Sequence, residues 1–263
     1  MPHSTDLPNL LVIAGLDPSG GAGLLADARV AERHGFRAVG VVTGLTEQDT
    51  HGVRRANPVP PEIVSAQLRA LLSDVAVAAV KIGMLASEAI AAAVADALAL
   101  TAAPVVWDPV LLPTRGRVAL YEGSTSRAVQ LLMPHVRVAT PNLAEAAALL
   151  GRGPIADVDG ARAAARALTA AGMEAVLVTG GHLTGDDRGT DVLAFGDVVV
   201  EVRGEWIAGD VPVHGTGCAL SSALACALAR GDDLPAAVRA AKQFVADRLR
   251  APAHPGRGMP SVM

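Results

Sequence analysis

The sequence has few cysteines, lysines and aromatic residues and little net charge, and these shortages exclude several classes of function. Its two cysteines, Cys218 and Cys226, would lie about 12 Å apart on one helix, too far for a disulfide between them. The net charge of −4 gives no basic surface for nucleic acid or an anionic membrane. Lys81 and Lys242 are the only lysines among 22 basic residues, so neither is readily explained as an ordinary surface residue.

Long apolar runs are also missing. No run reaches the ~18 residues that span a bilayer, and residues 1–6 lack the basic and apolar regions of a signal peptide. We therefore expect a cytosolic protein. The chain has 263 residues, 51% of them hydrophobic, which is enough to bury a large core. Since no linker or internal repeat divides it, we predict a single domain over residues 1–263.

Apolar runs typical of strands alternate with runs of helical period. Continuous apolar strands are expected where helices cover both faces of a sheet, so the alternation predicts an α/β/α sandwich with a mostly parallel sheet. The last two strands, joined by Gly196 and Asp197, predict a hairpin at one edge. The predicted strands are 9–14, 38–43, 79–82, 104–108, 136–140, 175–179, 191–195 and 198–203, and the helices between them are 24–34, 61–72, 87–100, 124–132, 143–150 and 160–171.

Glycine and polar residues follow the carboxyl ends of the first six predicted strands. Ligands of open α/β sheets bind at this edge. The glycines after the first strand match neither a P-loop, which needs a lysine where Gly21 stands, nor the Gly-x-Gly-x-x-Gly dinucleotide motif. Zinc-ligand spacing and a Gly-x-Ser-x-Gly elbow are also absent from the sequence.

The run His214-Gly215-Thr216-Gly217-Cys218 precedes an apolar stretch that predicts a helix. Glycines let backbone N–H groups turn toward a ligand, and a helix start adds unpaired donors and a positive dipole end. We call residues 215–218 the anion seat, because such a turn suits phosphate. The helix field would also favour a Cys218 thiolate, which could act as a base. The alternative is a glycine-capped loop before a buried helix with an inert cysteine.

The chain resembles the hydroxymethylpyrimidine/phosphomethylpyrimidine kinases, a branch of the ribokinase-like superfamily. This resemblance implies a ribokinase-like fold without a separate lid domain, and a homodimer. It also implies phosphorylation of 4-amino-5-hydroxymethyl-2-methylpyrimidine and then of its monophosphate in thiamine biosynthesis, with ATP and Mg²⁺. Three positions depart from the family pattern: Thr179 replaces a lysine, Thr114-Arg115-Gly116 replaces Lys-Ser-Gly, and Val213 replaces a threonine. The segments that carry the resemblance are 14–27, 43–52, 81–84, 108–110, 140–145, 179–182, 214–218 and 241–245.

The resemblance also implies a role for individual residues. Cys218 would be the base, with Gly215, Thr216 and Gly217 holding the migrating phosphoryl group. Mg²⁺ would be held by Asp108, Asn142 and Glu145, although Asn-x-x-Glu is equally a helix capping box. The nucleotide would be bound near Thr179, Gly181 and Lys242, the last of which could instead be a solvated residue on a helix.

For the acceptor, the Gln48 amide presents a donor beside an acceptor, which matches the edge of an aminopyrimidine; a turn-stabilising glutamine is the alternative. Gly15, Asp27 and Met84 complete the expected acceptor site. Asp27 could instead face solvent, and Met84 could be a core residue. Two other functions stay open: a pyridoxal-type vitamin kinase on the same fold, and a non-catalytic pyrimidine- or nucleotide-binding protein.

Overall fold

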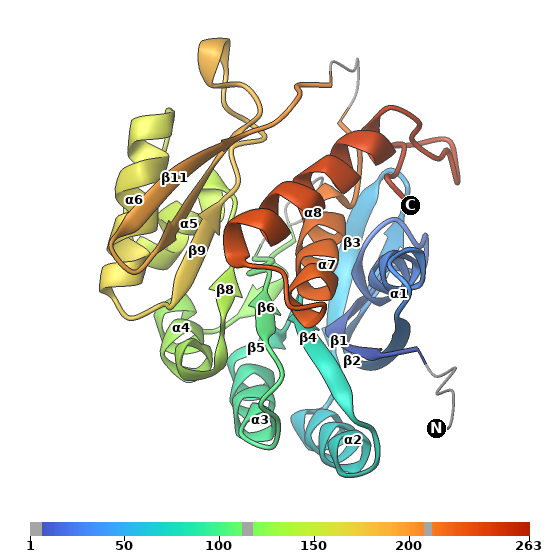
Figure 1. Ribbon diagram of the computed structural model, residues 1–263. Coiled ribbons are helices and arrows are strands. Elements are labelled where there is room, and N and C mark those ends of the chain that lie inside the picture. The colour runs from blue at the N-terminus through green and yellow to red at the C-terminus, as the bar shows by residue number, and fades with distance from the viewer. Residues whose placement is uncertain (1–6, 112–117, 208–211) are drawn as a thin grey trace, which may run out of the picture.

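The computed structural model describes residues 7–111, 118–207 and 212–263. Residues 1–6, which lack the pattern of a signal peptide, and residues 114–116, which depart from the family pattern, lie outside these ranges. A nine-stranded sheet in the order β11-β10-β9-β8-β6-β4-β1-β2-β3 forms the centre of the protein (Figure 1). Its strands are β1 (Asn9–Leu16), β2 (Arg37–Asp49), β3 (Gly52–Pro58), β4 (Val77–Ile82), β6 (Val105–Trp107), β8 (Val138–Ala139), β9 (Ala175–Val178), β10 (Thr190–Phe195) and β11 (Val198–Arg203).

The strands from β2 through β1, β4, β6 and β8 to β9 are parallel, which confirms the predicted sheet. Within the described ranges, antiparallel pairs occur only at the two edges of this sheet: β2 with β3, and β10 with both β9 and β11. The predicted hairpin of β10 and β11 is therefore confirmed. A separate pair, β5 (Ala86–Ser87) and β7 (Tyr121–Glu122), lies beside the main sheet.

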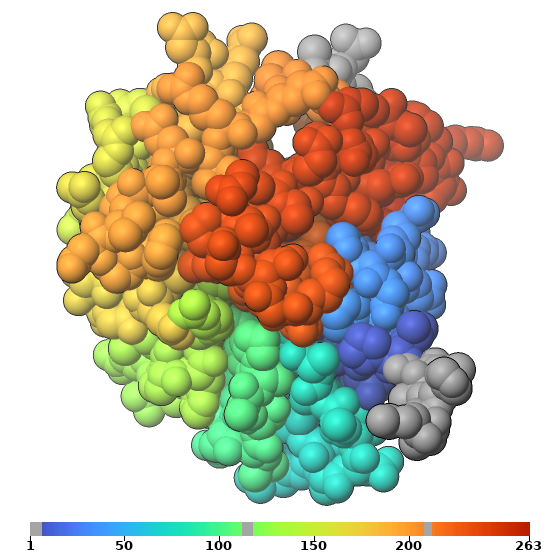
Figure 2. Space-filling view, viewed as in Figure 1, coloured from blue at the N-terminus to red at the C-terminus, as the bar shows by residue number. Residues whose placement is uncertain are grey.

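Helices cover both faces, each over its own apolar core. One face carries α1 (Gly23–Arg33), α7 (Thr216–Ala229) and α8 (Leu234–Leu249), which Figure 2 shows from outside in blue, orange and red. The burial of both sheet faces explains why the central strands are continuous apolar runs. The other face carries α2 (Pro61–Asp74), α3 (Glu88–Leu98), α4 (Thr125–Leu132), α5 (Leu143–Leu150) and α6 (Val158–Ala170).

Most helices begin where a side chain can accept a hydrogen bond from the first turn. Each such cap satisfies a backbone N–H that has no partner within the helix and contributes ~1 kcal/mol. The predicted helix boundaries therefore lie close to the observed ones. The capping residues are Ser87 for α3, Ser124 for α4, Asn142 for α5, Asp157 for α6 and Asp233 for α8.

The hairpin of β2 and β3 is the main feature that the sequence pattern did not predict. β2 continues six residues beyond the predicted end at Thr43, and β3 pairs with this extension from Gly44 onward. Polar residues such as Thr46 and Gln48 fill the extension. Because a hairpin at the sheet edge is only partly covered, it carries no continuous apolar run by which to recognise it.

Candidate active site

The start of α7 lies at the carboxyl edge of the parallel strands. Gly215 caps the helix with φ 85°, and a Cβ atom there would lie 2.0 Å from the Gly21 carbonyl oxygen, so only glycine fits. The first helical bond is donated by Ala219 N–H to Gly215 O at 2.9 Å. The N–H groups of the three preceding residues therefore have no partner within the helix. A Cβ atom on Gly217 would lie 3.7 Å from Asp108 Oδ2, so the structure brings the anion seat and this carboxylate together.

The Cys218 side chain lies at this helix start and stays partly accessible. Burial of its sulfur raises the pKa of the thiol to about 12, although Lys81 and a hydrogen bond from Gly23 N–H act to lower it. The expectation that the helix field favours the thiolate is therefore wrong. Desolvation of the charged form outweighs the helix dipole, whose effect is typically below 1 kcal/mol.

Asp108 directly follows β6, and Glu145 lies in the first turn of α5, which follows β8; both carboxyl groups are buried. Burial raises the pKa of Asp108 to about 6. Burial, followed by the charge of Asp108, raises the pKa of Glu145 to about 8. Ser221 Oγ donates to Asp108 Oδ2 at 3.2 Å. Two neighbouring carboxyl groups, one of which raises the pKa of the other, offer the hard oxygen ligands that Mg²⁺ prefers, so the donor set fits this ion.

Asn142 and Glu145 also form the capping box that the sequence left as an alternative. Asn142 N–H donates to Glu145 Oε2, and Glu145 N–H donates to Asn142 Oδ1, both at 2.9 Å. The capping box therefore occupies the Asn142 side-chain oxygen and one Glu145 oxygen, and the Leu111 N–H also donates to the Glu145 carboxylate. Within residues 7–111, 118–207 and 212–263, no three or more His, Cys, Asp or Glu side chains cluster as a metal site.

Gln48 lies beside the anion seat because His214 holds it there. Its Nε2 atom is 3.1 Å from His214 Nε2, and Thr46 Oγ1 donates to its Oε1 at 3.1 Å. His214 Nε2 is also 3.1 Å from Asp17 Oδ2. Asp17 accepts from Ser19 N–H at 2.8 Å, so it fixes the glycine turn after β1. The sequence analysis did not name Asp17 or His214 as site residues, although both lie within the quoted motifs.

Met84 and Gly15 pack against each other at the same edge. A Cβ atom on Gly15 would lie 2.4 Å from Met84 Cε, and one on Gly44 would lie 2.8 Å from it. The two glycines therefore make room for the Met84 methyl group across the ends of β1 and β2. Met84 is buried, which fits both a core residue and a residue behind the acceptor.

Asp27 is placed differently from either expectation, because it faces neither solvent nor an open pocket. Its carboxylate is fully buried and lies 2.7 Å from Lys81 Nζ, while Ser222 Oγ donates to its other oxygen at 2.8 Å. Burial alone would lower the pKa of Lys81, but the adjacent Asp27 carboxylate raises it above its usual value. Lys81 was not among the residues predicted for the site, although the rarity of lysine in the sequence is a signal that could have pointed to it.

Lys242, on the expected nucleotide side of the site, forms an ion pair with Asp191. Its side chain is only 16% exposed, so it is not a solvated residue on the surface of α8. Its Nζ atom lies 2.5 Å from Asp191 Oδ2, and Asp191 Oδ1 accepts from Gly180 N–H at 2.8 Å. Lys242 is thereby tied to the turn after β9. Thr179 forms an isolated β-bridge with Asn142. A Cβ atom on Gly181 would have no other atom within 4 Å. The structure therefore brings the three predicted nucleotide residues to one side of the metal candidates.

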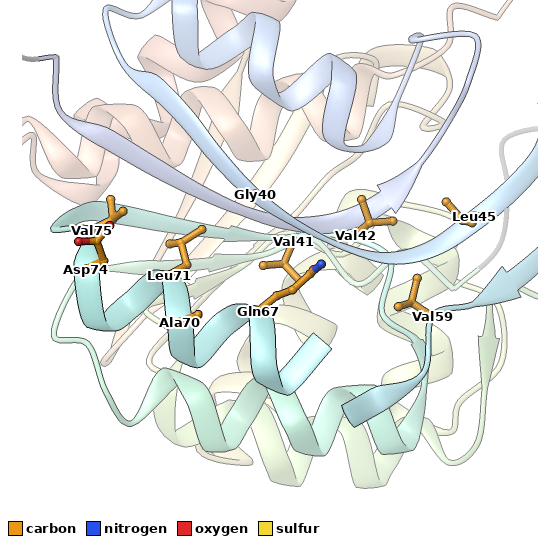
Figure 3. Close-up of a pocket in the computed structure, with 10 residues that line it drawn as sticks. All are labelled: Gly40, Val41, Val42, Leu45, Val59, Gln67, Ala70, Leu71, Asp74 and Val75. Atoms are coloured by element: carbon orange, nitrogen blue, oxygen red, sulfur yellow. The ribbon is translucent and has the colours of Figure 1, made fainter. Parts of the chain in front are cut away.

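A further cavity lies away from these residues. A groove of about 600 Å³ runs between β2 and α2 and is lined by Val41, Val42, Val59 and Leu71, among others (Figure 3). None of its lining residues is a predicted site residue. The described helices include none that is long and apolar enough to cross a membrane.

Comparison with known proteins gives matches over almost the whole chain. The family described as phosphomethylpyrimidine kinase matches residues 17–263. A hydroxymethylpyrimidine/phosphomethylpyrimidine kinase of Rhizobium meliloti (strain 1021) is 41% identical over 258 residues, covering 93% of this chain and 95% of the relative. A thiamine biosynthetic bifunctional enzyme of Arabidopsis thaliana is 38% identical and covers 92% of this chain, which spans 47% of that enzyme. The pyridoxal kinase of Staphylococcus aureus in complex with ADP superposes with a TM-score of 0.88 at 28% identity, over 98% of this chain and 93% of the other.

We predict that Glu145→Gln stabilises the metal-free protein at alkaline pH. The pKa of Glu145 is raised from 4.5 to about 8, so its contribution to stability is lost as pH rises through this interval. Glutamine keeps the cap and has no charge to bury. The melting temperature of the variant should exceed that of the wild type by several degrees at about pH 8.5 and by much less at about pH 5, because most of the interval between the two pKa values lies above pH 5.

The same melting curves, repeated with added Mg²⁺, separate the two roles of Glu145. Mg²⁺ should raise the melting temperature of the wild type at about pH 8.5 and raise that of Glu145→Gln much less. An equal response of both proteins to Mg²⁺ would leave Glu145 with the capping role alone.

Proposed function

The chain belongs to the phosphomethylpyrimidine kinase family, and from this premise we propose that it uses ATP to phosphorylate 4-amino-5-hydroxymethyl-2-methylpyrimidine and then its monophosphate. It is a small-molecule kinase of thiamine biosynthesis with a ribokinase-like fold. One observation carries the assignment of the site: the unpaired N–H groups at the start of α7 lie next to both the Asp108 carboxylate and, through His214, the acceptor candidate Gln48.

The transfer forms a bond between the acceptor oxygen and the γ-phosphorus of ATP. The bond from this phosphorus to the oxygen bridging the β-phosphate breaks, and ADP leaves. Negative charge gathers on the migrating phosphoryl group, and fixed backbone donors stabilise it without reorganising. The free N–H groups of Thr216, Gly217 and Cys218 supply such donors. The exposed Gly217 leaves the approach to them open.

Asp108 and Glu145 would hold Mg²⁺ on the nucleotide side, with Asn142 acting mainly as the helix cap. When bound, this ion neutralises phosphate charge. Lys242, fixed by Asp191 near Gly181 and Thr179, adds a positive charge for the nucleotide phosphates. The turn of Gly180 depends on the same Asp191 carboxylate, so the lysine and the turn are positioned together.

We assign recognition of the acceptor to Gln48, and we expect Gly15 and Met84 to pack against the pyrimidine ring. The contact to His214 orients the Gln48 amide, and His214 is in turn held by Asp17. The amide can then present its donor and acceptor to the amino group and ring nitrogen of the pyrimidine. Asp27 holds Lys81 through an ion pair and is not assigned a contact with the acceptor.

Cys218 is the proposed base for the first phosphorylation. Its thiolate would take the hydroxyl proton as the acceptor oxygen attacks. Because the pKa of the thiol is about 12, only a small fraction is thiolate at neutral pH. A hydroxymethyl group is a far weaker acid than a thiol, so a base at this position still lowers the barrier.

A second copy of the chain is the proposed occupant of the groove between β2 and α2. Residues 38–42 of β2 pair with β1 on one side, while β3 pairs only from Gly44 onward and Val59 N–H donates to Thr43 O. This open strand edge is flanked by the apolar groove and by Leu45, which is 50% exposed. Two such edges can pair antiparallel about a two-fold axis.

Light scattering tests this dimer. The wild type should have twice the mass of the 26.6 kDa chain. Leu45→Arg should dissociate it, while the control Leu100→Arg, at a residue that is 55% exposed at the end of α3, should not. A monomeric wild type at micromolar concentration would contradict the proposal.

The substrate assignment is tested by ADP release with a panel of acceptors. We expect release with the hydroxymethylpyrimidine and with its monophosphate, and a much lower kcat/KM with pyridoxal and pyridoxine. The pyridoxal-type alternative is supported by structural neighbours such as the S. aureus pyridoxal kinase, at 28% identity. A preference for pyridoxal would reverse the assignment, and binding of acceptors without ADP release would favour the non-catalytic alternative.

A further inference from the structure

Lys81 is fully buried in the middle of the sheet, in a chain that has one other lysine. It lies on β4, next to Val12 of β1 and Val106 of β6. Ala79, two positions earlier, packs in the core beneath α1 and α7. Because alternate residues of a strand share a face, the Lys81 side chain points toward the same two helices.

Its ammonium group links three elements of the fold. Lys81 Nζ on β4 lies 2.7 Å from Asp27 Oδ2 on α1, and Ser222 Oγ on α7 donates to Asp27 Oδ1 at 2.8 Å. All three side chains are fully buried. Ser222 follows Cys218 by four residues, so the ion pair lies one helical turn farther along α7 than the anion seat.

The ammonium lies nearer to the site edge than the Cα atom of Lys81 does. A Cβ atom on Gly83, at the carboxyl end of β4, would lie 2.8 Å from Lys81 Nζ, so glycine gives the ammonium room there. Lys81 acts more strongly than Asp27 on both Cys218 and Asp108, because in each case its effect on the pKa is the larger. The ion pair therefore presents its positive end to the site.

Stability alone does not explain a charge at this position. Removing two ions from water is so unfavourable that apolar residues of similar volume often give an equally stable protein. Among the buried residues of the described ranges, Lys81 is the one cation, while the buried acids include Asp17, Asp27, Asp108 and Glu145. A single buried cation at the edge where phosphate charge would gather indicates a role in the reaction.

We propose that Lys81 is a positioning residue of phosphoryl transfer, whose buried ammonium, held by Asp27, supplies a fixed positive charge beneath the anion seat. The inference rests on the proposed kinase function. The charge strengthens the stabilisation given by the backbone donors of residues 216–218 in a site of low dielectric. It acts on the migrating group in both phosphorylation steps, because neither step changes the groups that face the phosphoryl.

The test replaces the ion pair by neutral pairs, because Lys81→Met alone would leave the Asp27 charge uncompensated. In Lys81→Met/Asp27→Leu, both the charge and the acceptor for Ser222 are removed. Lys81→Met/Asp27→Asn removes the charge but keeps that acceptor. Cys226→Ala, a change in the apolar core farther along α7, is the control for repacking of the helix. Single-turnover rates, KM values and melting curves are measured for each protein.

Both neutral pairs should lower kcat by about 10–100-fold with the alcohol and with the monophosphate, leaving KM for the acceptor within a few-fold. The melting curves should show that at least one of the two is folded. Wild-type kcat in a folded neutral pair would overturn the inference, as would a loss confined to the Leu pair, which would assign the effect to the hydrogen bond of Ser222. A wild type that is inactive with every acceptor would instead refute the proposed function.

Discussion

The contact between Gly215 and the Gly21 carbonyl is the constraint on which the rest of the site depends. It leaves no space for a Cβ atom and places the start of α7 against the turn that follows β1. His214 then reaches Asp17 and Gln48, and the free N–H groups of α7 lie next to Asp108. A larger residue at position 215 would move the phosphoryl donors away from both half-sites, since its left-handed backbone and the close contact both require glycine.

Much of the fold could be predicted from the sequence, because strands that are buried on both faces of a sheet consist of continuous apolar runs. The polar hairpin of β2 and β3 could not, because its residues are partly exposed and their pairing depends on the neighbouring sheet. The boundaries of α5 followed from its capping box, which combines a local hydrogen-bond pattern with a local sequence signature.

The position of the candidate site could be predicted from the sequence, but the pKa shifts and ion pairs of its residues could not. Strand ends and the glycine run placed Asp108, Glu145, Gln48 and the anion seat at one edge. The sign of the pKa shift at Cys218 depends on burial by distant segments, so a helix-start argument from sequence gave the wrong direction. The pairing of Asp27 with Lys81 joins residues 54 positions apart, and no local pattern encodes it.

If the backbone at the start of α7 serves the phosphoryl group while the Cys218 thiol serves only as a base, single-turnover kinetics of Cys218→Ala separate the two roles. The first acceptor is an alcohol whose proton must be removed, whereas the second is a phosphate already ionised at neutral pH. We predict that the variant slows transfer to the alcohol by roughly 10²–10⁴-fold and transfer to the monophosphate far less, whereas Gly217→Val slows both. Equal slowing of both steps by Cys218→Ala would contradict the account and leave the cysteine with a role in shaping the anion seat alone.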